Sequence, residues 1–111
     1  MKTIEKSSLI DLDKKMKAVA KNYFISRKIQ ELDELAMKDA EEIEKTQHSV
    51  YVRRIERAFN SLSREEQTFI NNDYFYEAYP FWWLKQYPPS TYYRIKKKSV
   101  INFLKALYNE E

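Results

Sequence analysis

The chain of 111 residues contains no glycine. Strand-rich folds need residues with positive φ at tight hairpin turns, and glycine usually supplies them. Phosphate-cradling loops and the dinucleotide-binding turn also depend on glycine. Its absence therefore excludes P-loop and dinucleotide-binding sites, and it favours helices joined by short connections.

Cysteine and long apolar runs are missing as well. Without cysteine the chain has neither disulfides nor thiolate metal sites. No stretch approaches the roughly 18 apolar residues that a bilayer span requires, so we expect no membrane segment. Residues 2–6 carry no apolar core of a secretory signal, so we expect a cytoplasmic protein.

The apolar periodicity indicates an all-α fold, a helical bundle of one domain. Ser7 or Ser8 can cap a first helix, whose inward stripe is formed by Leu9, Leu12, Met16, Val19 and Tyr23. A second stripe follows with Ile25, Ile29, Leu32, Ala36 and Ile43. Residues 9–45 therefore form either one long helix or two with a break between positions 22 and 27.

The spacing of seven between Leu9, Met16 and Tyr23 allows a coiled-coil seam and thus a homodimer through the N-terminal helices. The alternative is that these residues pack against the rest of the same chain. We divide the chain at this point into an N-terminal amphipathic region, residues 1–46, and a compact C-terminal region, residues 47–111.

Four more helices are predicted in the C-terminal region. One begins near Thr46 or Ser49 and ends at Asn60, and Ser63 with Glu66 forms a capping box that opens the next. That helix directs Phe69, Ile70 and Tyr74 inward and ends between positions 76 and 79. Pro80 then allows a short helix through Leu84 before a turn that contains Pro88 and Pro89.

The last helix is expected from Pro89 or Ser90 to about Tyr108. Its inward stripe is expected to contain Tyr92, Ile95, Ser99, Phe103 and Ala106, widened by Val100, Leu104 and Leu107. The outer face of its first turns then carries Ser90, Thr91, Tyr93, Arg94, Lys97 and Lys98. Hydroxyls, an arginine and lysines are the groups that contact phosphates and bases, so we predict that these residues bind duplex DNA.

The charge distribution agrees with this prediction. Residues 31–44 contain seven acids against one lysine, whereas residues 78–109 contain six bases and no acid. Such asymmetry favours contact with nucleic acid by the basic part, although a solvated helix face is the alternative. We also considered that the acidic segment folds over the basic helix and masks it.

A family resemblance rests on two segments. They are Ile55-Glu56-Arg57-Ala58-Phe59-Asn60-Ser61-Leu62 with Glu65-Glu66, and Ser90-Thr91-Tyr92-Tyr93-Arg94-Ile95-Lys96-Lys97-Lys98-Ser99. Residues 51–107 resemble the ArpU/RinA-like phage late-gene transcriptional regulators and similar small mollicute proteins, which in turn look like region 4 of sigma-70 factors. The resemblance implies a helix-turn-helix in which Ser90, Thr91, Tyr93 and Arg94 read DNA.

The chain departs from that pattern in its turn. Pro88 stands where the family has a serine or threonine cap, and Gln86 stands where it has glycine, so we expect Ser90 to cap the helix instead. Ten of the twenty residues from Tyr74 to Tyr93 are aromatic. They form either a stacking platform for single strands or, as we favour, a core that includes Tyr74, Phe81, Leu84 and Tyr92. Of Trp82 and Trp83, one is expected to point outward.

No residue pattern indicates catalysis. His48 is the only histidine, and with Glu44 it supplies two metal ligands without a third, so we expect neither a metal site nor a cofactor. The prediction is a non-enzymatic transcriptional regulator that binds double-stranded DNA, with RNA polymerase as a further possible partner. The alternatives are a sigma-like polymerase-associated factor without independent DNA binding, and a protein-interaction module.

Overall fold

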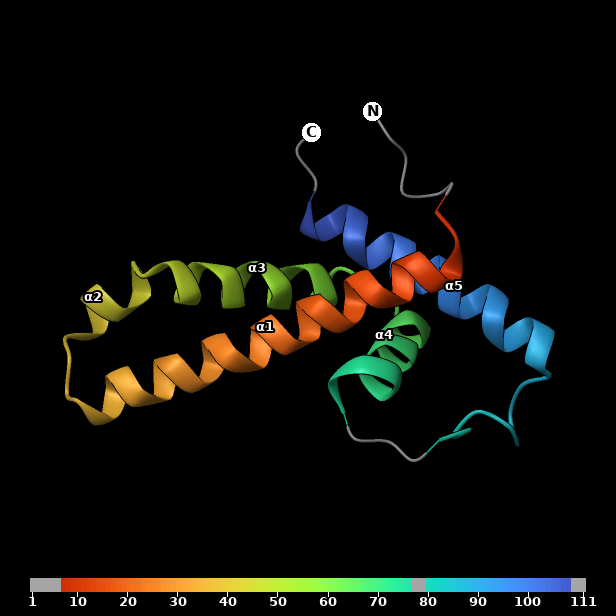
Figure 1. The fold of residues 1–111 in the computed structure, drawn as a ribbon, viewed down its shortest axis with the longest axis horizontal. Helices are drawn as coiled ribbons and strands as arrows, with labels where there is room; N and C mark the ends of the chain where they lie inside the picture. Colours follow the sequence, from red (N-terminus) through yellow and green to blue (C-terminus); the bar gives the residue numbers. More distant parts are fainter. Residues whose placement is uncertain (1–6, 77–79, 109–111) are drawn as a thin grey trace.

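The computed structural model describes residues 7–76 and 80–108, and these residues form helices and turns without any strand (Figure 1). The all-α fold predicted from the sequence is confirmed. In chain order the elements are α1 (Leu9–Leu35), α2 (Ala40–Glu44), α3 (Gln47–Asn60), α4 (Arg64–Ile70), the π-helical turn η2 (Asn71–Phe75) and α5 (Pro89–Leu107).

The helix α1 is one continuous helix of 27 residues. Ser8 caps it, since its side chain accepts a hydrogen bond from the backbone N–H of Asp11 (3.2 Å). No break occurs between positions 22 and 27. The helix ends after Leu35, where Met37 takes a positive φ of 60° and the chain reverses into α2.

The reversal makes an arm in which α2 and α3 run back along α1 (Figure 1). Polar contacts hold the outer part of this arm together. The amide of Gln30 donates to the hydroxyl of Ser49 (3.0 Å), and His48 Nε2 lies 3.0 Å from a carboxylate oxygen of Asp33. Polar residues of α1 therefore face α3 here.

The prediction that a second apolar stripe of the first helix points inward is wrong, because polar residues of α1 face α3 instead. Ile25, Ile29 and Leu32 have exposed fractions of 48%, 37% and 56%, and Ala36 is exposed too. Only Ile43 of that set is buried, on α2. Periodicity identified residues that share one helix face, but α3 covers the neighbouring face.

The main core lies where α1, α3, α4 and α5 meet. It contains Leu12, Met16, Val19, Ile55, Ala58, Leu62, Ile70, Val100, Phe103, Leu104 and Leu107. Met16 is fully buried and Tyr23 packs against this core from the same chain. Packing within the same chain, the alternative to a coiled-coil seam through Leu9, Met16 and Tyr23, is therefore what the structure shows. Residues of α1 thus share one core with the C-terminal region.

The capping box that opens α4 is confirmed, with Ser63 and Glu66 bonded in both directions. Phe69 and Ile70 are buried as predicted, and Tyr74 is half-buried. The α-helix ends earlier than expected, because after Ile70 the chain continues as the π-helical turn η2. Part of the predicted end, positions 77–79, lies outside the described residues.

The short helix predicted from Pro80 to Leu84 is wrong. This segment consists of turns, in which the N–H of Leu84 donates to the carbonyl of Phe81 (3.1 Å) and the N–H of Tyr87 to that of Trp83 (2.9 Å). Phe81 has a φ of 60°, a value incompatible with a right-handed helix. Phe81 and Leu84, predicted to point inward, are exposed.

The helix α5 has nearly the predicted bounds. Its buried side is formed by Tyr92, Ile95, Ser99, Val100, Phe103, Leu104 and Leu107, which leaves Ala106, predicted inward, on the exposed side. The N-cap is Pro88, and Ser90 lies within the first turn. The predicted Ser90 cap is therefore wrong, because Pro88 already has the extended backbone that an N-cap needs and Pro89 fits the first helical position.

Candidate nucleic-acid interface

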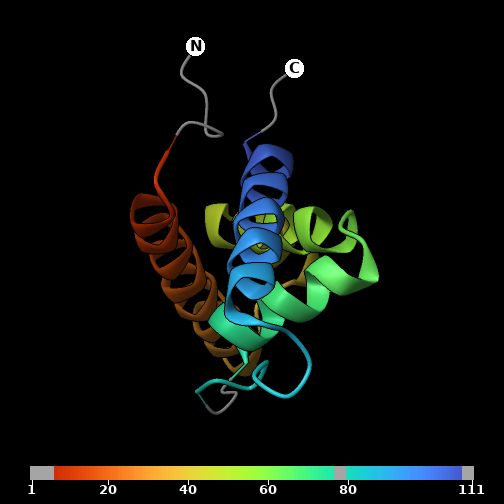
Figure 2. The ribbon, with the colours of Figure 1, turned by 90° about the vertical axis from the view of Figure 1, so that its right-hand side faces the viewer.

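The outer face of α5 presents most of the predicted site residues to solvent. Ser90, Tyr93, Arg94 and Lys98 are exposed, and Thr91 and Lys97 are half-buried. In Figure 2 the helix lies in front of the other helices, and none of them crosses it. We refer to these six residues as the α5 outer face.

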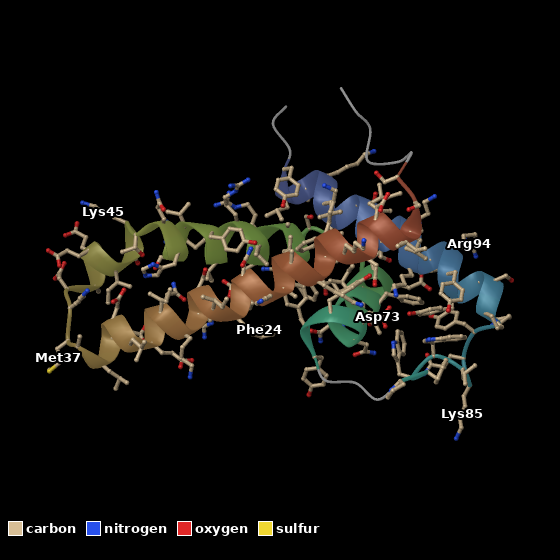
Figure 3. The ribbon with its side chains drawn as sticks, viewed as in Figure 1. Phe24, Met37, Lys45, Asp73, Lys85 and Arg94 are labelled. Atoms are coloured by element: carbon tan, nitrogen blue, oxygen red, sulfur yellow. The ribbon has the colours of Figure 1, made fainter. Side chains whose placement is uncertain are left out.

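The charges on this face are of one sign. No acid occurs on α5, and neither Arg94 nor Lys97 forms an ion pair or hydrogen bond with any other described residue. In Figure 3, Arg94 projects from α5 on the side away from Asp73. Lys98 lies close enough to Glu66 for its charge to contribute to the lowered pKa of that carboxyl.

The acidic segment does not mask this face. Met37 and Lys45, which flank the turn and α2, lie at the end of the molecule opposite Arg94 (Figure 3). The α1–α3 arm separates the acids of residues 31–44 from the first turn of α5 (Figure 1). The masking considered from the sequence is thus not found in this structure.

The first turn of α5 has no side-chain cap, whereas α1, α2, α3 and α4 are capped by Ser8, Asp39, Thr46 and Ser63. The backbone N–H groups of Ser90 and Thr91 have no acceptor among the described residues. Proline supplies no N–H group at the two preceding positions. Two N–H groups and the positive end of the helix dipole are therefore directed toward solvent beside the basic side chains.

The inner side of the same turns is held by an aromatic cluster. The ring of Tyr92 stacks on that of Trp83, with 4.0 Å between centroids and 8° between planes, and on that of Phe69 at 5.6 Å. Ile95 completes the buried cluster, and Trp82 and Tyr87 pack against it. Both tryptophans thus contact the cluster, contrary to the expectation that one points outward.

Asp73 connects η2 to this cluster through three side chains. Its carboxylate accepts hydrogen bonds from the indole N–H of Trp82 (2.7 Å) and from the hydroxyl of Tyr92 (2.6 Å). The ammonium group of Lys96 lies 3.6 Å from the same carboxylate. Burial and the bond to Asp73 raise the pKa of Tyr92 far above its usual value. Asp73 therefore fixes both the turn segment and the first turns of α5.

A second carboxylate joins α1 to the same group. Asp13 accepts a hydrogen bond from the hydroxyl of Tyr74 (2.5 Å), and Lys96 lies 3.5 Å from it. Burial opposes ionisation of Asp13, but the hydrogen bonds from Tyr74 and Lys17 and the charge of Lys96 together lower its pKa. Burial and the bond to Asp13 raise the pKa of Tyr74. Lys96 is thus a structural cation, unlike Lys97 beside it.

Glu66 fixes α4 against α5. Its carboxylate accepts from the backbone N–H of Ser63 (3.0 Å) and from the amide of Asn102 (2.6 Å). These bonds outweigh the effect of burial and lower the pKa of Glu66. The sequence indicated the capping role of Glu66 but not its contact with Asn102. Nor did it indicate Asp13, Asp73 or Lys96, whose partners are distant along the chain.

The helix-turn-helix geometry differs from the prediction. Because residues 80–84 are not helical, the helix that precedes α5 is α4 with its extension η2, and the connection runs from Tyr76 to Pro88. A turn of about four residues is replaced by this longer segment. The helix α4 still packs directly against α5, so α5 remains supported along its inner side.

The histidine does not form a metal site. His48 pairs with Asp33, and no group of three or more potential metal ligands occurs among the described residues. In the described part of the chain, no helix has the length and apolar character to cross a bilayer.

No protein-family model, no curated protein and no solved structure matches this chain. The resemblance to the ArpU/RinA-like regulators therefore stays an expectation from the sequence.

Proposed function

We propose that the protein is a transcriptional regulator that binds double-stranded DNA through the α5 outer face. The observation that carries this proposal is the contrast between the two sides of one helix. On the inner side Lys96 is neutralised by Asp13 and Asp73, and on the outer side Arg94 and Lys97 have no partner among the described residues. Unpaired cations on a rigid exposed helix suit the phosphates of a duplex.

The dimensions of the helix agree with a major-groove position. The major groove of B-DNA, about 12 Å wide, admits one α-helix. The first turns of α5 combine an arginine able to pair with guanine, hydroxyls from Ser90 and Thr91, and two N–H groups available to a phosphate. Tyr92 and Ile95 anchor these turns from beneath, so little ordering is required on binding.

The test compares duplex affinities of two variants that lose the same charge. Replacing Arg94 and Lys97 by alanine removes the proposed contacts, whereas replacing Arg53 and Lys45 by alanine removes an exposed arginine and lysine elsewhere. Fluorescence anisotropy with labelled duplexes should show a loss of ~30-fold or more for the first variant, as two contacts of about 1–3 kcal/mol imply. The second variant should bind as the unaltered protein does.

Equal losses of affinity in both variants would show that only net charge matters and would contradict binding through the α5 outer face. Tighter binding of single strands than of duplexes would favour the aromatic platform instead. The same measurement with purified RNA polymerase added distinguishes an independent DNA binder from a sigma-like factor, because only the latter requires the polymerase.

A further inference from the structure

An apolar stripe runs along the outside of α1, on the face that neither α3 nor α5 covers. Its members are exposed and are spaced by seven, four, three and four residues: Ala18, Ile25, Ile29, Leu32 and Ala36. Asn22 occupies the remaining position of this heptad pattern. Alternating steps of three and four are the pattern of a coiled-coil seam, in which one polar member is common. We call this set the α1 outer stripe.

The stripe lies on a preformed helix. Contacts with α3 support α1 toward its end at Leu35: the amide of Gln30 donates to the hydroxyl of Ser49, and His48 Nε2 lies 3.0 Å from a carboxylate oxygen of Asp33. From Ala18 to Ala36 the stripe extends about 28 Å at 1.5 Å per residue. A pair of short helices is ordinarily only marginally stable, because both helices must form as they associate. Here each helix is already formed within its own chain, so association does not carry that free-energy cost.

The charges along α1 and α2 indicate which partner covers the α1 outer stripe. Residues 14–28 carry six bases and no acid: Lys14, Lys15, Lys17, Lys21, Arg27 and Lys28. Residues 31–35, at the end of the same helix, carry three acids and no base, and four further acids lie at the start of α2 or on it. The change of sign falls in the middle of the stripe, between Ile25 and Leu32. A parallel copy would set base against base, and an antiparallel copy sets base against acid.

We infer that the α1 outer stripe pairs with the same stripe of a second copy of this chain, in antiparallel orientation about an axis near position 27. This register places Ile25 opposite the Ile29 of the other copy and Ala18 opposite its Ala36. Lys17 and Lys21 then lie along the acidic end of the partner's α1, and Arg27 and Lys28 lie near the axis. A two-fold contact of this kind is closed and self-complementary, as in most soluble dimers.

The first experiment measures oligomeric state without DNA, so it is independent of the proposed function. Sedimentation equilibrium of the full chain at high micromolar concentration should give twice the monomer mass, and I25D/I29D should give the monomer mass. The control I10D places an acid at an exposed apolar residue of the same helix, outside the stripe, and should remain dimeric. Circular dichroism verifies that each variant keeps its helices. A monomeric unaltered chain, or a dimeric I25D/I29D variant, would overturn the inference.

The second experiment determines orientation, and it uses the absence of cysteine. Under oxidation, A18C mixed with A36C should give a disulfide between the two different variants, while A18C alone should not cross-link. Efficient cross-linking of A18C to itself would show a parallel pair and contradict the charge argument. Raising the salt concentration should weaken the dimer, because screening reduces the attraction between the opposed halves.

Discussion

The ring of Tyr92 on α5 lies parallel to the ring of Trp83, 4.0 Å away, and its hydroxyl donates to Asp73 at 2.6 Å. One side chain thus joins the turn segment, η2 and the helix that carries the α5 outer face. The orientation of Arg94 and Lys97 depends on this contact, because they follow Tyr92 by two and five residues on the same helix.

Replacing Trp83 by alanine should lower the free energy of unfolding by about 3–5 kcal/mol, since a buried aromatic side chain and its stack on Tyr92 are lost. Replacing Phe81, an exposed neighbour, by alanine should change it by under ~1 kcal/mol. Urea unfolding followed by circular dichroism measures both. Similar losses for the two variants would mean that Trp83 is not the anchor.

Asp73 and Tyr92 should be energetically coupled. Tyr92→Phe removes one hydrogen bond to a carboxylate and should cost about 1.5–3 kcal/mol. Asp73→Ala should cost more, because Tyr92 and Trp82 both lose their acceptor. The loss of unfolding free energy in the double variant should be smaller, by ~1 kcal/mol or more, than the sum of the losses in the two single variants. Strictly additive values in this cycle would argue against the observed contact.

Alkaline pH should destabilise the protein through its buried tyrosines. Burial and the hydrogen bond to Glu56 raise the pKa of Tyr23 to about 12, and the pKa values of Tyr74 and Tyr92 are raised as well. A raised folded-state pKa means that stability is complete below the unfolded value of about 10 and declines as pH rises above it. Urea unfolding at pH values between neutral and about 11 should show this decline, and Tyr74→Phe should reduce it.

A chain without glycine must end its helices in other ways, and Met37 shows the consequence. It has a φ of 60°, and its N–H and that of Lys38 donate to the carbonyls of Glu34 (3.0 Å) and Asp33 (3.3 Å). This is a Schellman ending, which favours glycine at the position of Met37. Met37→Gly should therefore raise the free energy of unfolding by ~1 kcal/mol, the approximate cost of this conformation for other residues.

The contrasting control is Ala36→Gly. Ala36 has a φ of −77°, which any residue adopts readily, so glycine there gains nothing and should be neutral or destabilising. Thermal unfolding is sufficient to rank the two variants. A lower melting temperature for Met37→Gly than for the unaltered chain would contradict the assigned backbone conformation.

Local chemistry explains which parts of the fold could be predicted from the sequence. The start of α1 at Ser8 and the capping box of Ser63 and Glu66 follow from contacts within a few residues. The inward positions of Tyr92 and Ile95 follow from helical periodicity. The outward Arg94 follows from the same helical periodicity. These features need no knowledge of distant segments.

The features that were missed depend on long-range packing. Periodicity placed Ile25 and Ile29 on one face, but the polar bonds of the arm decided that α3 covers another. Pro80 suits the first position of a helix, yet Phe81 takes a positive φ. Asp73 meets Trp82 and Tyr92 only because η2 turns it toward α5, and no sequence spacing indicates such a contact.

The most direct measurement of DNA recognition is a selection from random duplexes by the full chain at two salt concentrations. Binding through the α5 outer face should enrich one sequence motif at both concentrations, with affinity that falls as salt rises, and Lys97→Ala should reduce the slope of that salt dependence by about one unit. No enrichment at either concentration, together with duplex affinity that R94A/K97A leaves unchanged, would contradict the proposal.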